Sequence, residues 1–487
     1  MRTRTSTIGL LVFASAPVLA QTDMSVFSTT GRAAATTFVT DYQAIGINPA
    51  NLGWDGRWPK KKVFIGFAEA SVSAYSQAFT RSDLRASFLG NLAQLTYDQK
   101  VAAAKDIANT DFTLNVDAMS FGAAYRTDAF GGLGFQIRDR AQWNSNLNLL
   151  TSDLLFLGST SNYFDQVILA NGDTLQNTGG FSQATIDQIV KGIQEDHPLT
   201  LSTLLEGTQI SMSWYREYNM SYGRSIIHND NLELYAGIGL KYLAGIGIID
   251  VRSDGSGRLT AYSALSPFFN LDYGSASLTT NAITVNNGLF PSPVGSGFGM
   301  DLGLSAIIKQ KWKLGASVTN IGSITWKGNV YQANDALLTD LSSTGIDTYN
   351  ILNGIDQFVS EDGVLQWQGE SKRTVPLAAN MRLGAGMLLG QIAELGVDVI
   401  VPLNDEPGSY NKPVLGIGGD LRPVKWLQLS AGVISGGDYD TKIPVGITFD
   451  VAQGTWEFGV ASRDAITFFS ENAPTVSLCV GFLRFRF

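Results

Sequence analysis

The chain has 487 residues, of which 44% are hydrophobic and 16% charged, and its net charge is −9. A net negative charge argues against nucleic-acid binding, since phosphate contacts need clustered lysine and arginine. The single cysteine, Cys479, excludes an internal disulfide framework, and two histidines leave almost no ligands for a histidine-based metal site.

The first twenty residues have the pattern of a secretory signal peptide. Arg2 and Arg4 give a positive start, residues 8–16 are a short apolar run, and the small residues Val18 and Ala20 precede the expected cleavage site. No later stretch reaches the roughly 18 apolar residues that a spanning helix needs. We therefore expect an exported protein without a transmembrane helix.

Residues 21–60 lack the alternation of a strand and consist largely of small residues. Alanines at 33–35 are followed by Asp41 and by the sequence Asn48-Pro49-Ala50. Asparagine before proline favours a turn, because its side chain bonds backbone N–H groups while proline fixes φ. A compact segment of this kind can fold back into the lumen of a barrel.

From residue 61 onwards the chain is dominated by alternating apolar and polar residues. The alternation is strict in 297–309, 311–319, 374–389, 391–401, 425–433 and 442–451. Such strands belong either to a soluble sandwich or to a transmembrane barrel that turns its apolar face to lipid. Three features favour the barrel: the signal peptide, the isolated charges beside glycine on the polar face, and the alternating end at 483–487. That ending resembles the signal by which the barrel assembly machinery recognises outer-membrane barrels.

The spacing of the strands predicts their number. Short connections at 127–131, 227–230, 309–311, 390–391, 423–425 and 453–454 indicate periplasmic turns. Longer segments at 81–111, 145–207, 250–295, 321–371, 402–411, 435–441 and 465–474 indicate extracellular loops. Together they give about 14 antiparallel strands with both termini in the periplasm. Residues 258–273 are either a further membrane strand or half of an extracellular hairpin.

Two of the loops carry helix signals. A capping box at Thr185 and Gln188 precedes the apolar residues of 186–193, and a second helix is expected to start at Thr96 and Gln99. Such helices either pack on the rim of the barrel or form a platform for a substrate or partner.

The expected luminal face is rich in glycine and carries charges of both signs. The glycines either leave room for a plug or relieve strain where the sheet curves to close; they are Gly237, Gly239, Gly299, Gly303, Gly384, Gly386, Gly396, Gly416, Gly418, Gly446 and Gly459. The charges should pair with one another or with the plug, rather than form the single-sign ring of an ion-selective pore. They include Asp301, Arg382, Glu394, Asp398, Asp420, Arg422 and Glu457.

The segment around Asn48-Pro49-Ala50, between the signal peptide and the first strand, resembles the N-terminal hatch of FadL-type outer-membrane barrels. It is also similar to an uncharacterised branch of these barrels and to the PorV-type barrels of type IX secretion. The resemblance implies a 61–487 barrel with a 21–60 hatch inside it, in which Asp41, Asn48, Pro49 and Ala50 form the hatch motif. It also implies a lateral opening at the third strand, where Gly131, Gly132 and Gly134 would permit a kink.

No pattern in the sequence indicates catalysis, a cofactor or a metal site, so we expect a protein that is not an enzyme. The resemblance implies an outer-membrane location in a Gram-negative-type envelope, in contact with membrane lipid. Three roles remain open. The first is a FadL-like channel for a hydrophobic small molecule such as a long-chain fatty acid or an aromatic hydrocarbon. The second is a PorV-like adaptor for secreted or surface proteins, and the third is a purely structural barrel.

Overall fold

The computed structural model describes residues 26–78, 80–81, 94–254, 256–283, 291–347, 363–410, 412–437, 439–472 and 474–487. The expected signal peptide, residues 1–20, lies outside these ranges. None of the helices in the described residues is long and apolar enough to cross a membrane.

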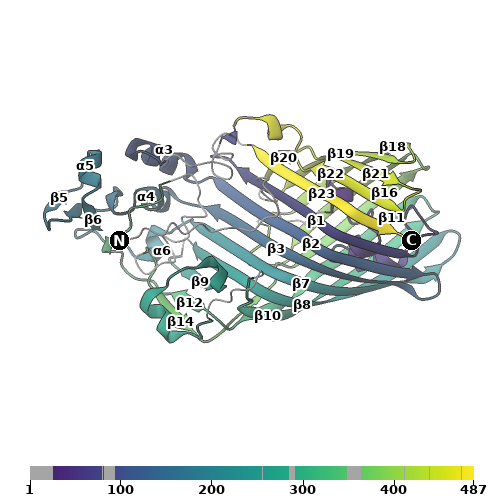
Figure 1. The fold of residues 1–487 in the computed structure, drawn as a ribbon, viewed down its shortest axis with the longest axis horizontal. Coiled ribbons are helices and arrows are strands. Elements are labelled where there is room, and N and C mark those ends of the chain that lie inside the picture. Colours follow the sequence, from purple (N-terminus) through teal and green to yellow (C-terminus); the bar gives the residue numbers. More distant parts are fainter. Residues whose placement is uncertain are drawn as a thin grey trace.

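Fourteen long antiparallel strands in the described part of the chain close into one ring (Figure 1). In order round the ring they are β1 (Val63–Ser76), β2 (Asp111–Thr127), β3 (Gly131–Asn146), β7 (Gln209–His228), β8 (Leu232–Ser253), β10 (Gly295–Ile308), β11 (Trp312–Trp326), β16 (Asn380–Leu389), β17 (Ala393–Pro402), β18 (Val414–Val424), β19 (Leu427–Gly436), β21 (Val445–Val451), β22 (Trp456–Ser462) and β23 (Thr475–Arg486). The ring closes because β1 pairs with β2 on one side and with the last strand on the other. The predicted antiparallel barrel is confirmed.

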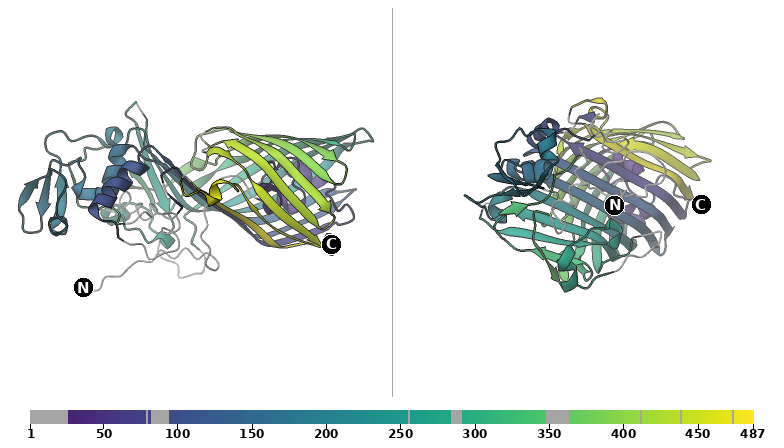
Figure 2. Two further views of the ribbon diagram at one scale, coloured as in Figure 1. Left: turned by 90° about the horizontal axis from the view of Figure 1, so that it is seen from above. Right: turned by 60° about the vertical axis from the view of Figure 1, so that its left-hand side comes forward.

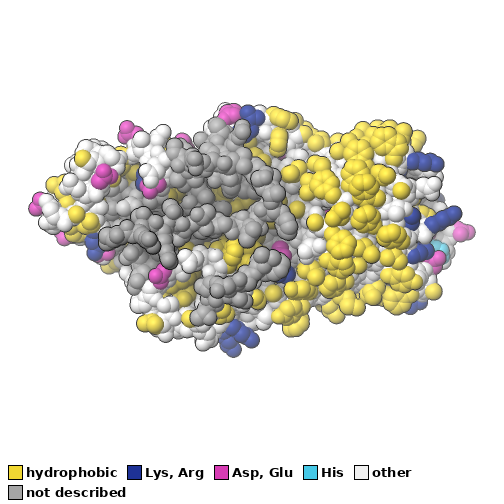
Figure 3. Space-filling model, viewed as in Figure 1, with side chains coloured by type: hydrophobic (Ala, Val, Ile, Leu, Met, Phe, Trp, Pro, Cys, Tyr) yellow, Lys and Arg dark blue, Asp and Glu magenta, His cyan; other side chains and the backbone are white. Residues whose placement is uncertain are grey.

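The alternation in the sequence divides each strand between lipid and lumen. On β10, Leu302 and Leu304 are exposed on the outside, whereas Asp301 between its apolar neighbours is buried inside. Similar exposed apolar side chains cover the outer wall as a broad band (Figure 3). Exposed Trp312 is the first residue of β11 and exposed Trp426 lies in the turn between β18 and β19, as expected for side chains at a membrane interface. The barrel therefore presents lipid with the surface that a bilayer requires.

The short connections join strands at one end of the ring, and all six predicted turns are confirmed. They lie at 128–130, 229–231, 309–311, 390–392, 425–426 and 452–455. Residues 258–273 are not a membrane strand. β9 (Leu259–Leu265) pairs with the far part of β8, from Gly247 to Ser253, whereas β10 pairs with β8 only up to Gly245. β9 thus belongs to an extension of the wall above the ring, together with β12 (Val330–Ala333) and β14 (Trp367–Glu370).

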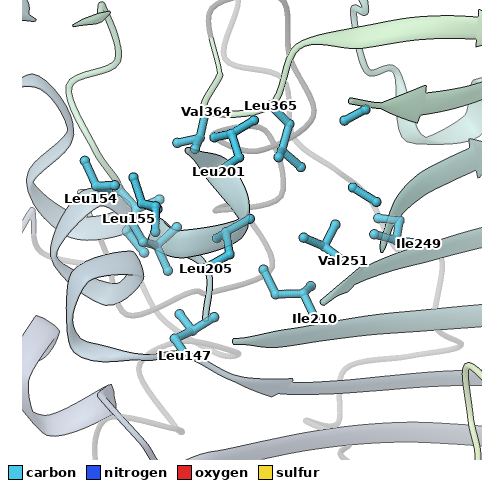
Figure 4. Close-up of a cluster of buried hydrophobic side chains, with 14 of the residues drawn as sticks. Leu147, Leu154, Leu155, Leu201, Leu205, Ile210, Ile249, Val251, Val364 and Leu365 are labelled. Atoms are coloured by element: carbon cyan, nitrogen blue, oxygen red, sulfur yellow. The ribbon is translucent and has the colours of Figure 1, made fainter. Parts of the chain in front are cut away.

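The long loops fold together into a cap beyond the other end of the ring (Figure 2). The cap contains α3 (Tyr97–Ile107), α4 (Leu149–Leu157), α5 (Gln183–Ile186), α6 (Leu201–Leu204) and a small sheet of β4 (Gln166–Leu169), β5 (Thr174–Gln176), β6 (Ile189–Ile193) and β13 (Asp340–Leu341). Its core of buried apolar side chains includes Leu154, Leu201 and Val364 (Figure 4). Ile210 and Ile249 of β7 and β8 join this core, so the ends of these strands belong to the cap.

One of the two predicted cap helices is confirmed. Thr96 is the N-cap of α3: its side chain accepts from the Gln99 N–H, while the Gln99 side chain accepts from the Thr96 N–H. The other is wrong. Ser182, not Thr185, caps the short α5, and Ile189–Ile193 is the strand β6. The reason is tertiary: this β-branched sequence gains backbone pairing with β4 and β13, which a helix would not allow.

Changing a lipid-facing leucine to lysine should destabilise the barrel only within the apolar band. Leu304 on β10 is 53% exposed and faces lipid, so Leu304→Lys is expected to make the free energy of folding into a bilayer less favourable by about 2–4 kcal/mol. Leu278 in the cap is 86% exposed to water, and Leu278→Lys should leave that free energy unchanged. Urea titrations of folding into lipid vesicles measure both, and equal effects would contradict the assigned membrane band.

Candidate functional site

The lumen of the ring is occupied by the N-terminal segment, residues 26–60, which we call the plug. It contains one short helix, α1 (Phe27–Thr30), and two 3-10 turns, η1 (Asp41–Ala44) and η2 (Pro49–Gly53). Ile45 and Ile47 in its centre are completely buried. Some of its side chains pack with wall residues such as Phe64 and Met119.

Each of the fourteen strands has a glycine where it contacts the plug. On every strand there is at least one glycine at which an added Cβ would lie 3.4 Å or less from an atom of the plug. Taking one from each strand in order round the ring, they are Gly66, Gly122, Gly132, Gly223, Gly237, Gly303, Gly315, Gly384, Gly396, Gly416, Gly432, Gly446, Gly459 and Gly481. These glycines make a seat for the plug, which favours the first of the two explanations open at sequence level. The predicted luminal glycines Gly239 and Gly299 lie outside the seat, because their nearest neighbours are wall residues.

The Asn48-Pro49-Ala50 motif lies in this seat. The Asn48 side-chain oxygen accepts from the Ala50 N–H at 3.2 Å and so caps η2, whose first residue is Pro49. The Asn48 amide nitrogen donates to the wall, to the Leu304 carbonyl at 3.1 Å and to Ser305 Oγ at 2.9 Å. The same side chain thus shapes the turn and attaches it to β10.

Buried ion pairs fix the plug to the last strands. Asp41 Oδ2 lies 2.7 Å from Arg484 Nη2 on β23, and Arg484 also pairs with Glu457 on β22. Arg486 bridges Glu457 and Asp450. Loss of one partner from such a chain leaves a buried charge unpaired, which typically costs about 3–5 kcal/mol.

A pocket lies between the plug and one side of the wall. Its plug side is Thr29, Thr30 and residues 33–35. Its wall side is mainly apolar and comprises Asp398, Ile400, Val414, Gly416, Ile434, Pro444 and Arg463. Ile400, Val414, Ile434 and Ala33 pack with Tyr410, which comes from the β17–β18 loop.

Asp398 belongs both to the pocket and to the attachment of the plug. Its Oδ2 accepts from the backbone N–H groups of Ala35 and Thr36, at 2.7 and 2.8 Å, and from the Thr36 hydroxyl at 2.8 Å. Its Oδ1 has no hydrogen-bond partner among the described residues, although the side chain is buried. One carboxylate thus holds the plug with one oxygen and lines the pocket.

The loop between β17 and β18 folds inward over this region. Arg252 on β8 donates to Asp405 Oδ2 at 2.6 Å, and Gly408 lies against the Gln142 side chain of β3. Because β3 and β8 lie across the ring from β17 and β18, the loop spans the lumen above the pocket.

The other sequence-selected charges also face the lumen and interact there. Asp301 lies 3.0 Å from Lys241, which also approaches Glu217 at 3.4 Å. Glu394 pairs with Lys313 at 2.6 Å and with Arg422 at 3.4 Å.

Two further positions complete this set. Asp420 pairs with Arg422 at 2.7 Å and faces Arg32 of the plug at 3.6 Å. Arg382 is buried near Asp398 and Tyr410.

Comparison with known protein families shows to which family the chain belongs. The sequence model of a family described as "Family of unknown function (DUF5723)" matches residues 59–452. The chain belongs to this DUF5723 family. The match begins just before β1, so all but the last two residues of the plug precede it. No curated protein matches the sequence.

Several solved structures match this DUF5723 barrel over most of its length, with little sequence identity. The Pseudomonas putida toluene transporter TodX is 12% identical with a TM-score of 0.44, and 96% of this chain and 99% of that chain are covered. The Ralstonia pickettii toluene transporter TbuX is 12% identical with a TM-score of 0.43, covering 94% and 97%. A Pseudomonas aeruginosa FadL homologue is 11% identical with a TM-score of 0.36, covering 96% and 97%. One of these matches is named as a FadL homologue, the type of barrel that the sequence around Asn48-Pro49-Ala50 resembles.

The strand expected to open sideways is fully paired in the DUF5723 barrel. Gly132 and Gly134 on β3 pair with β2 and with β7 without a shift of register. Gly131 is the residue that leaves the turn, with φ +93°. The plug explains the two inner glycines better than a kink does, because Leu52 lies against both of them.

Sequence reasoning missed one wall residue that holds the plug. Glu69 on β1 accepts from the Tyr42 hydroxyl at 2.6 Å and from the Gln43 amide at 3.0 Å. Strict alternation from Phe64 and Gly66 would turn Glu69 to lipid. Ala68 has φ +52°, and this left-handed residue shifts the alternation by one position. A charged residue within an apolar strand was the available signal.

Filling the glycine seat should displace the plug. Gly237 on β8 lies against Pro49 and Ala50, so Gly237→Val is expected to weaken plug binding, because a side chain there would overlap with plug backbone. Its neighbour Ala236 is on the opposite, lipid-facing side of β8. Ala236→Val is therefore the matched control.

Limited proteolysis of residues 26–60 and single-channel conductance in planar bilayers report on the plug. Gly237→Val should increase both cleavage and conductance, and Ala236→Val should change neither. If Gly237→Val leaves both readouts at the wild-type level, the glycine seat is not needed to hold the plug.

Proposed function

We propose that this protein is an outer-membrane channel that takes up a hydrophobic small molecule. The observation that carries the proposal is the mainly apolar pocket whose floor is the plug itself. The cavity measures about 30 Å³, so a cargo molecule that enters between Ala33 and Ala35 of the plug and Ile400 and Ile434 of the wall has to displace the plug. Occupancy of the pocket and the position of the plug are therefore coupled by direct contact.

Asp398 supplies a physical route for this coupling. The residue binds two backbone N–H groups of the plug and also lines the pocket. A ligand that changes the environment of this carboxylate changes the strength of those bonds, because hydrogen bonds to a charged group are stronger than neutral ones. In this mechanism a cargo enters from the cap, settles on the plug and loosens it, and then leaves the lumen.

In the sequence, the size and helical content of the outer loops favour the adaptor role. In the structure these loops pack largely on one another and on the ends of β7 and β8, around one apolar core. That packing explains the apolar residues of the loops without a protein partner, and we do not carry the adaptor role further.

Replacing Asn48-Pro49-Ala50 by three alanines should change uptake without preventing assembly. The replacement removes two hydrogen bonds to β10, worth about 1 kcal/mol each, so the population with a displaced plug should rise up to about 30-fold. The variant is expressed in cells from which the gene for this protein has been deleted. We expect these cells to take up a radiolabelled aromatic hydrocarbon or long-chain fatty acid faster than cells that express the wild-type protein.

The control is Asn171→Ala in the exposed β4–β5 turn, which should leave uptake at the wild-type rate. Surface labelling and heat-dependent migration on gels show whether each barrel has assembled. Unchanged uptake of both cargo classes by an assembled triple-alanine variant would count against the proposed function.

A further inference from the structure

A second luminal surface faces the pocket from across the ring. It consists of polar side chains on four adjacent strands, which we call the polar stripe: Ser73 on β1, Thr113, Asn115 and Asp117 on β2, Arg138 on β3 and Thr475 on β23. Ser73 stands directly opposite Asn115 in the β1–β2 register. Arg138 donates to Asp117 Oδ1 from Nη1.

The polar stripe is buried but incompletely hydrogen-bonded. Asn115 is 4% exposed. Neither its amide nitrogen nor its amide oxygen has a partner among the described residues. The same holds for the hydroxyls of Ser73, Thr113 and Thr475, for Asp117 Oδ2 and for Arg138 Nη2. Buried polar groups are nearly always paired, so a cluster of unpaired ones marks a place where another molecule belongs.

The stripe and the pocket lie on opposite walls of one lumen. β2 and β17 are seven strands apart in the ring of fourteen. Tyr410 connects the two surfaces, because it packs with Ile400 and Val414 of the pocket and interacts with Arg140. Arg140 in turn is the register partner of Asp117. A molecule that touches both walls meets apolar groups on one side and unpaired polar groups on the other.

We infer that the cargo is an amphiphile whose polar group is neutral and both donates and accepts hydrogen bonds, such as an amide or a hydroxyl. The inference rests on the proposed function and specifies its substrate class. The stripe offers free donors on Asn115 and Arg138 and free acceptors on Asn115 and Asp117. A plain hydrocarbon leaves all of these unpaired. A carboxylate can accept from Arg138 Nη2 but has no donor for the free oxygens of Asn115 and Asp117. A primary amide pairs with both ends of the Asn115 side chain.

Three probes with the same phenylalkyl body separate these possibilities: pentylbenzene, 4-phenylbutanamide and 4-phenylbutyrate. Their binding to the purified full-length barrel in lipid nanodiscs is measured by isothermal titration calorimetry. Wild type should bind the amide most tightly. Asn115→Leu should weaken amide binding about tenfold, the equivalent of one to two hydrogen bonds, and change pentylbenzene binding less than about twofold. Asn171→Leu, in the exposed β4–β5 turn, should change neither.

The outcomes distinguish the inference from the function on which it rests. If pentylbenzene binds and the amide binds no better, or if the carboxylate binds best, the amphiphile class is wrong while the channel stands. An equal loss for amide and hydrocarbon in Asn115→Leu also overturns the inference, because the residue then acts only on the shape of the lumen. Binding of none of the three probes by assembled wild-type barrel contradicts the proposed channel itself.

Discussion

The structure depends on the close approach of one segment of backbone to the inner wall of the ring. A barrel of fourteen strands is too wide for its own side chains to fill, so its lumen either holds water or holds another part of the chain. Here residues 26–60 fill one part of it, and each strand contributes a glycine at the contact. The absence of a Cβ lets backbone meet backbone, and this determines where the plug lies and which charges it can reach.

Several polar contacts of the plug are made by residues that have more than one partner. Arg484 holds Asp41 and Glu457, and Asp398 holds two adjacent N–H groups while it lines the pocket. Such buried charges are strongly destabilising when one partner is lost, so the attached and detached states of the plug are separated by a few discrete contacts. A ligand that weakens one of these contacts can therefore detach the plug without rearrangement of the barrel wall.

The cap follows from the unequal lengths of the strands. β7 and β8 continue beyond the ring, and β9 pairs with the free edge that this extension leaves on β8. Their outer faces at this height carry Ile210 and Ile249, which belong to the core of the cap rather than to the lipid-facing band. Because the same alternating pattern serves lipid below and the cap above, the upper limit of the membrane band is not visible in the sequence.

The sequence by itself determined the barrel, its strand number, its six turns and the mixed charges of its lumen. These features rest on local pattern: a period of two divides a strand between lipid and lumen, and turn residues separate the strands. Only the tertiary structure decided the rest. It placed Glu69 inside, because one left-handed residue at Ala68 shifts the alternation. It made Ile189–Ile193 a strand, because distant partners offered backbone pairing. It also showed that the luminal glycines make room for the plug. The contact between the plug and wall strands that are distant along the chain has no local signature in the sequence.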